Sequence, residues 1–169
     1  MTTELILIRH GESEANVGLS KEPDCRLTEK GIEQARMLGA RLADFDLAGF
    51  SGIASPYMRT WHTAAEISQA TGLSFAVEEL VREWGDVATV KGTQYHKETA
   101  AELIGRLGEF LRVYAGRKLV IVSHAAPIAV LTQLAWGEAP NTEGQFWNGV
   151  NNCCLRRLWT TYHSVPVTT

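Results

Sequence analysis

The amino-acid sequence predicts an α/β fold with a mainly parallel central sheet, and three features of the pattern support this class. Aliphatic runs such as residues 4–8 and 118–122 are nearly continuous in apolar side chains, as in strands buried on both faces. Longer segments with apolar residues at steps of three and four alternate with these runs, which is the order of strands joined by crossover helices. The chain has 169 residues without an internal repeat or linker, so residues 1–169 are expected to form one domain.

The N-terminal half is expected to contain two strands, each followed by a helix. A polar loop follows the first strand, and Thr28 is the expected N-cap of the first helix. Residues 50–54 form the second predicted strand. Ser55 and Pro56 then match the N-cap and first position of a second helix, which is expected to end near Gly72.

The C-terminal half continues the alternation. Residues 73–81 contain a third predicted strand, and residues 98–114 form the clearest helix because their apolar positions keep helical spacing. The strand at 118–122 is followed by a predicted helix at 128–136. Residues 153–159 are expected to form the last strand.

Composition excludes several classes of protein. Sixteen basic and nineteen acidic residues give a net charge of −3, and no basic run predicts binding to nucleic acid or to an anionic membrane. Polar residues interrupt the longest apolar stretch, at 119–136, so no membrane span is expected. Cys153 and Cys154 are adjacent and, with Cys25, predict reduced thiols rather than a disulfide framework. Without a recognisable targeting segment, a cytoplasmic location is expected.

Polar clusters stand directly behind three of the predicted strands. Ligands of open α/β sheets bind beyond the carboxyl ends of the strands, so these clusters are expected to share one cleft. They are Arg9-His10-Gly11, Ser55-Pro56 with Arg59, and Ser123-His124-Ala125.

Such a cleft would bind an anion. Guanidinium groups match phosphate oxygens, and helix N-termini add further N–H donors. Positive neighbours disfavour protonation of an imidazole, so a histidine beside Arg9 and Arg59 keeps a nucleophilic lone pair near neutral pH. A metal site built from the histidines is not expected, because no metal-ligand spacing is present and the arginines would repel a cation.

The same clusters carry a resemblance to a known family. Four segments occur in the order seen in the histidine phosphatase superfamily, which includes the phosphoglycerate mutases. They are Leu7-Ile8-Arg9-His10-Gly11-Glu12-Ser13-Glu14-Ala15-Asn16, Leu27-Thr28-Glu29-Lys30-Gly31 with Gln34-Ala35, Ser55-Pro56-Tyr57-Met58-Arg59-Thr60 with Thr63-Ala64, and Val120-Ile121-Val122-Ser123-His124. The resemblance implies a three-layer sandwich with helices on both faces of the sheet, and chemistry that uses no metal or other cofactor.

The resemblance also implies a role for each matching residue. His10 would be the nucleophile and form a phosphohistidine. Arg9, Arg59 and His124 would bind the transferred phosphoryl group. Asn16 would donate a hydrogen bond to a phosphate oxygen, and Glu83 would be the proton donor.

The sequence departs from the family pattern at two places. Ala125 stands where the family often has glycine. Alanine keeps the backbone N–H, so this group can still bind phosphate unless the position needs a positive φ. The segment after Glu83 is compressed, which leaves Asp86 as an alternative proton donor and Trp84 as a packing or pocket residue. Residues 86–98 are also too few for the helical cap of larger family members, and this favours hydrolysis over mutase chemistry.

Three functions remain open on the sequence. A phosphatase acting on a phosphorylated small molecule or a phosphoprotein is expected. The alternatives are a phosphoglycerate mutase-type phosphotransferase and a non-catalytic module that binds phosphorylated ligands. The substrate and the oligomeric state do not follow from the residues.

Overall fold

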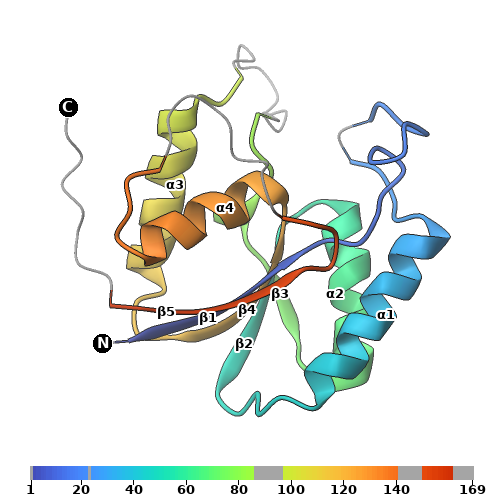
Figure 1. Cartoon of the computed structure of the whole chain (residues 1–169), viewed down its shortest axis with the longest axis horizontal. Helices are drawn as coiled ribbons and strands as arrows, with labels where there is room; N and C mark the ends of the chain where they lie inside the picture. Colours follow the sequence, from blue (N-terminus) through green and yellow to red (C-terminus); the bar gives the residue numbers. More distant parts are fainter. Residues whose placement is uncertain (1, 23, 86–96, 141–149, 162–169) are drawn as a thin grey trace.

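The computed structural model describes residues 2–22, 24–85, 97–140 and 150–161. A five-stranded sheet in the order β3-β2-β4-β1-β5 runs through the middle of the molecule (Figure 1). Its strands are β1 (Thr3–Arg9), β2 (Phe50–Ala54), β3 (Phe75–Val77), β4 (Lys118–Ser123) and β5 (Leu155–Thr160). Strands β1 to β4 are parallel, and β5 pairs antiparallel with β1. The prediction of a mainly parallel sheet is therefore confirmed.

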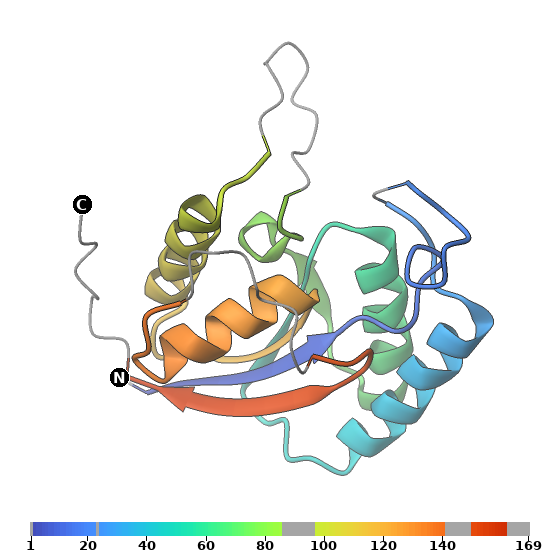
Figure 2. The same cartoon turned by 45° about the horizontal axis from the view of Figure 1, so that its top comes forward.

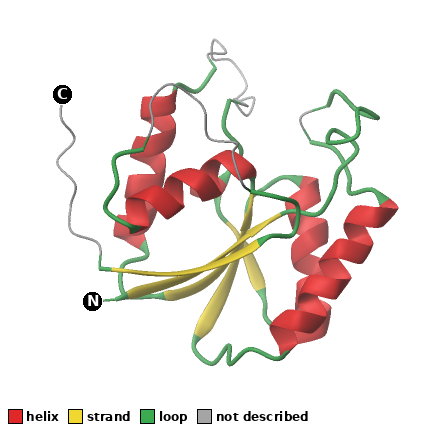
Figure 3. Cartoon of the chain, in the orientation of Figure 1, coloured by secondary structure: helices red, strands yellow, loops and turns green. Residues whose placement is uncertain are grey.

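Helices cover both faces of this sheet, as expected for a three-layer sandwich. Helices α1 (Glu29–Ala43) and α2 (Met58–Thr71) lie on one face, and α3 (Ala100–Val113) and α4 (Ala125–Ala135) lie on the other (Figures 1 and 2). The colouring by secondary structure in Figure 3 shows the strands between the two helical layers.

The middle of strand β1 is apolar at four consecutive positions, from Leu5 to Ile8. Leu5 and Leu7 pack into the core beneath α3 and α4, whereas Ile6 and Ile8 point into the core beneath α1 and α2. All four side chains have no exposed surface. Alternate residues of a strand face opposite sides, so the middle of a strand between two helical layers is apolar at consecutive positions.

Helix α1 begins where its sequence predicts. The Thr28 side chain accepts a hydrogen bond from the Gly31 backbone N–H at 3.0 Å. Gly31 also allows the helix to approach the loop after β1, because a Cβ atom there would lie 1.9 Å from the Glu12 carbonyl oxygen. This contact holds the loop after β1 against the start of α1.

The predicted cap of α2 is wrong. Helix α2 begins at Met58 rather than directly after Ser55, and its N-cap residue, Tyr57, makes no side-chain capping bond. The Asp24 carboxylate instead accepts a hydrogen bond from the Met58 N–H at 2.6 Å. The Ser55 hydroxyl instead contacts the ring of His124, the residue that follows β4. Arg59 still lies in the first turn of α2.

Two further boundaries differ from the predictions. Helix α4 begins at Ala125, so Pro127 lies inside its first turn, where a missing backbone N–H is tolerated. Its residues are buried on nearly every side, and no amphipathic period marks its start. Strand β3 is short, and the end of the predicted 73–81 strand forms instead the 3₁₀ helix η1 (Glu79–Val81).

The remaining elements follow the sequence closely. Helix α3 begins with a capping box in which Thr99 and Glu102 bond each other's backbone N–H groups. Strand β5 begins at Leu155, because Cys153 has a φ of 50° and the chain turns there. The three cysteines are free thiols. Across the described part of the chain, no helix has the length and apolar character needed to cross a bilayer.

Candidate active site

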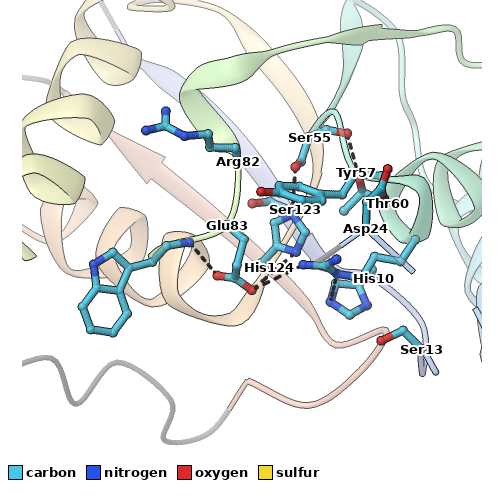
Figure 4. A network of polar contacts seen from close by, with 12 residues as sticks. His10, Ser13, Asp24, Ser55, Tyr57, Thr60, Arg82, Glu83, Ser123 and His124 are labelled. Carbon is cyan, nitrogen blue, oxygen red and sulfur yellow. Dashed lines mark hydrogen bonds and ion pairs between the residues drawn. The ribbon is translucent and has the colours of Figure 1, made fainter. Parts of the chain in front are cut away.

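Two histidines lie side by side where β1 and β4 end. Arg9 and Ser123 are paired in the register of these parallel strands, so the next residues, His10 and His124, leave the sheet together. Their ring centroids are 5.2 Å apart, with an interplanar angle of 64° (Figure 4). Arg59, in the first turn of α2, donates through Nε to His10 Nε2 at 3.2 Å. The three clusters identified in the sequence therefore meet at one site.

The hydrogen bonds of His10 determine its tautomer. Nδ1 lies 2.7 Å from the Gly11 carbonyl oxygen, which can only accept, so Nδ1 carries the proton. Nε2 is then left with a lone pair, which accepts from Arg59. Burial, followed by the positive charge of Arg59 and then that of Arg9, lowers the pKa of His10 from 6.5 to about 3. His10 is therefore a neutral imidazole with a basic nitrogen beside a guanidinium group.

His124 is oriented by a buried serine. Ser55 Oγ lies 2.7 Å from His124 Nε2, and both side chains are fully buried. The other ring nitrogen, Nδ1, lies 3.5 Å from Glu83 Oε2 and makes no hydrogen bond. Burial and then the charge of Arg59 hold the pKa of His124 well below its usual range. His124 is thus a neutral imidazole at this site.

Tyr57 packs against two members of the site. Its ring meets the His124 ring edge-on at 5.3 Å between centroids, and the Arg59 guanidinium carbon lies 4.7 Å from its centre. Contact with an aromatic face stabilises the guanidinium next to the histidines.

A cleft of about 560 Å³ opens above His10. Arg9 lies on its wall and donates through Nη1 to the Val150 carbonyl oxygen at 2.7 Å. His124 is not part of the wall, because it is covered completely. The cleft is lined by Arg9, His10, Ser13, Ala15, Asn16, Ser20, Lys21, Glu22, Arg59, Glu83, Trp84 and Ala125.

Asn16 lies on the cleft wall with its amide oriented. Its Oδ1 accepts hydrogen bonds from the Ser13 N–H at 3.1 Å, the Ser13 hydroxyl at 3.2 Å and Asn152 Nδ2 at 3.1 Å. These donors hold the oxygen, so the Nδ2 group remains as the donor available to a ligand oxygen.

Ala125 is accommodated without strain. It is the first residue of α4 and is buried at the cleft wall. Among the described non-glycine residues only Cys153 has a positive φ, so the position of Ala125 does not require glycine. Its N–H lies at a helix N-terminus, where backbone donors favour an anion.

Glu83 reaches the site from the segment after η1. Its Oε2 lies 3.5 Å from His124 Nδ1 and 4.0 Å from Arg59 Nη2, and its Oε1 accepts from the Trp84 N–H at 2.9 Å. The side chain is 15% exposed, so it faces the cleft without being free in solvent. Trp84 lines the cleft and also packs against the core, which unites its two predicted roles. Asp86, the alternative proton donor, lies outside the described residues.

Three residues support the site in roles that the sequence does not predict. Ser55 belongs to one of the three clusters, but it contacts His124 instead of capping a helix. Asn152 Nδ2 donates to the His10 carbonyl oxygen at 3.0 Å, and Thr63 accepts from the Gly11 N–H at 3.0 Å. Thr63 follows Arg59 by one helical turn, so its place on the same face of α2 was available from the spacing. No local signal marks Asn152.

The donor set suits an anion rather than a cation. The described part of the chain contains no cluster of three or more His, Cys, Asp or Glu side chains able to hold a metal ion. Two neutral imidazoles lie among arginines, which attract phosphate oxygens and repel a metal.

Comparison with known proteins identifies the family of the chain. The family model of the histidine phosphatase superfamily, branch 1, matches residues 5–104, and the chain belongs to this superfamily of enzymes. The matched range includes His10, Arg59 and Glu83 but ends before His124, so the placement of His124 rests on the geometry.

The names of the similar proteins include both mutases and phosphatases. A protein of Erwinia tasmaniensis named "Probable phosphoglycerate mutase" is 26% identical over an alignment that covers 92% of this chain and 84% of that protein. A mycobacterial glucosyl-3-phosphoglycerate phosphatase has a similar structure, with a TM-score of 0.72, 21% identity and coverage of 94% and 91% of the two chains. A phosphoglycerate mutase from Bacillus anthracis gives a TM-score of 0.70 at 18% identity, with coverage of 97% and 92%. At these identities the structures show a shared fold.

Proposed function

We propose that the chain is a metal-independent phosphatase that hydrolyses phosphomonoesters through a phosphohistidine on His10. The observation that carries this proposal is the state of His10 Nε2, which is unprotonated, bonded to Arg59 and placed beneath an open cleft. A neutral imidazole nitrogen surrounded by guanidinium groups can attack a phosphoryl group whose oxygens those groups bind.

In the first step, His10 Nε2 attacks phosphorus and the bond from phosphorus to the ester oxygen breaks. Arg59 moves its hydrogen bond from Nε2 to a phosphoryl oxygen, and Arg9 and Asn16 bind the others, while the buried His124 lies behind Glu83. A protonated Glu83 gives its proton to the leaving oxygen, so the alcohol departs neutral. Placement and charge stabilisation supply most of the catalysis in reactions of this kind.

In the second step, water replaces the alcohol. Glu83, now a carboxylate, takes a proton from the water as its oxygen attacks phosphorus. The bond from phosphorus to Nε2 breaks, inorganic phosphate leaves, and the lone pair returns to Nε2. Glu83 ends protonated, so the enzyme is ready for another turnover.

The second candidate is a mutase, and the names of the curated relatives favour it. A mutase has to keep water away from its phosphohistidine. The short stretch between Glu83 and α3, most of which lies outside the described residues, supports hydrolysis instead. A phosphorylated small molecule and a phosphoprotein are both proposed as substrates on the same chemistry.

The first test compares wild type with His10→Ala on p-nitrophenyl phosphate, with and without EDTA. We expect the variant to lose turnover by roughly a hundredfold or more, because a nucleophile is removed, and EDTA to have no effect. His62→Ala, on α2 and outside the cleft, is the matched control and should keep wild-type turnover. An unchanged rate in His10→Ala would remove the proposal.

A second measurement separates the candidates. A phosphatase should form an acid-labile phosphoenzyme and release phosphate from a panel of phosphorylated metabolites and phosphopeptides. A mutase should instead convert a phosphoglycerate isomer only after priming with a bisphosphorylated compound. Tight vanadate binding without any phosphoenzyme would identify a non-catalytic binding module.

A further inference from the structure

The segment that carries Glu83 has little regular structure of its own. Helix η1 ends at Val81, and residues 82–85 continue without a described helix or strand. A side chain on such a segment holds its position only if other elements bind the backbone around it.

Arg106 of α3 binds the backbone directly before Glu83. Its Nη1 donates to the Leu80 carbonyl oxygen at 2.7 Å and to the Arg82 carbonyl oxygen at 3.1 Å. The Arg82 carbonyl belongs to the peptide group that also contains the nitrogen of Glu83. One guanidinium group therefore binds the backbone immediately before the proposed acid.

A second anchor ties the same segment to β4. The Ser123 hydroxyl donates to the Val81 carbonyl oxygen at 2.7 Å, and Ser123 directly precedes His124. Three consecutive carbonyl groups before Glu83 are thus bound by side chains. These bonds tie the segment before Glu83 to α3 and to the end of β4.

Arg106 is itself oriented by Glu98. Its Nε and Nη2 each lie 2.7 Å from a different Glu98 oxygen, in a two-pronged ion pair whose side chains are 7% and 5% exposed. Arg82 Nη2 adds a bond to Glu98 Oε1 at 3.1 Å. The pair leaves Nη1 of Arg106 directed at the two carbonyl groups, because the guanidinium fork is planar.

From this geometry we infer that Arg106 and Glu98 are positioning residues that hold Glu83 where it can protonate the leaving oxygen. The inference rests on the proposed function. Neither residue lines the cleft, so both act through the backbone that carries Glu83. Displacing a catalytic group by about 1 Å can cost roughly a hundredfold in rate, so loss of this anchor should be visible in the proton-transfer step.

The test replaces the pair by apolar residues of similar size in a Glu98→Leu/Arg106→Met variant. Exchanging both partners of a buried ion pair for well-packed apolar side chains usually preserves stability, whereas the bonds to the two carbonyl groups are lost. Glu109→Leu/Arg112→Met is the matched control, since it removes an exposed ion pair from the same helix, outside the cleft.

The measurement is kcat/KM on phenyl phosphate and on p-nitrophenyl phosphate. The phenolate of the first needs a proton from the enzyme far more than the nitrophenolate of the second. We expect the paired variant to lose roughly tenfold or more on phenyl phosphate relative to p-nitrophenyl phosphate. Glu83→Gln should show the same selective loss, Arg106→Lys an intermediate one, and the control pair none.

Equal losses on both substrates, or an unchanged ratio, would overturn the inference. So would a Glu83→Gln variant without selectivity between the substrates. If circular dichroism shows that the paired variant is unfolded, Arg106→Lys decides, and a wild-type ratio there refutes the role. Retained turnover in His10→Ala would instead refute the proposed function, so the two failures are distinguishable.

Discussion

Replacing His10 with asparagine should make the protein less sensitive to acid. The folded protein holds the pKa of His10 at about 3, against 6.5 for the ordinary side chain. As the pH falls below 6.5, the unfolded chain takes up a proton at this residue and the folded protein does not. The stability linked to His10 is therefore complete above that pH and is lost as the pH falls toward 3.

The size of the effect follows from the window. Each pKa unit corresponds to about 1.4 kcal/mol. Between about pH 8 and pH 5, the free energy of unfolding therefore falls by about 2 kcal/mol because of this one group. The linkage of His124 has the same sign and stays in the variant, so the difference between the two proteins reports on His10.

Urea titrations followed by circular dichroism at both pH values provide the measurement. Buffers without phosphate or sulfate are needed, because an anion bound to the cleft would stabilise the native state. From about pH 8 to pH 5, wild type should lose about 2 kcal/mol more than His10→Asn. The comparison at about pH 8 is the internal control, because His10 binds no proton there in either the folded or the unfolded state. An equal pH dependence in the two proteins would refute a neutral, buried His10.

Three further predictions follow from the packing around the site. Ser55→Ala should lower kcat/KM by roughly tenfold without unfolding the protein, because His124 loses the hydroxyl that orients its ring; wild-type kinetics would contradict this. Asp24→Ala should lower the free energy of unfolding by about 1 kcal/mol, because α2 loses the carboxylate that caps it; an unchanged denaturation midpoint would count against the cap. Gly31→Ala should destabilise by roughly 1–3 kcal/mol, since its Cβ would overlap the neighbouring backbone, whereas Gly105→Ala, with open space around it, should stabilise by roughly 0.5–1 kcal/mol. Thermal melts of the two glycine variants that moved in the same direction would contradict the packing argument.

The parts of the fold that the sequence predicted are those controlled by local patterns. The aliphatic runs of β1 and β4 indicated strands buried on both faces, and Thr28 marked the start of α1. The start of α4 was misplaced because a helix buried on nearly all sides carries no amphipathic period. The capping residue of α2 was missed because Asp24 reaches it from a distant loop.

The same division holds at the site. The order of motifs pointed to His10, Arg59 and His124, and the position of each behind a strand predicted that they meet. Which nitrogen of His10 carries its proton depends on contacts with Gly11 and Arg59, and Arg59 comes from another element. No sequence pattern contains that information.

By itself, the sequence determined the class of fold, the strand ends where chemistry collects, and the family of the chain, because each depends on residue types at short spacing. The tertiary structure decided the tautomer of His10, the partner of Ser55 and the anchor behind Glu83. Those depend on hydrogen bonds between segments far apart in the chain, and such bonds exist only after the sheet has aligned its strands and the helices have packed against it.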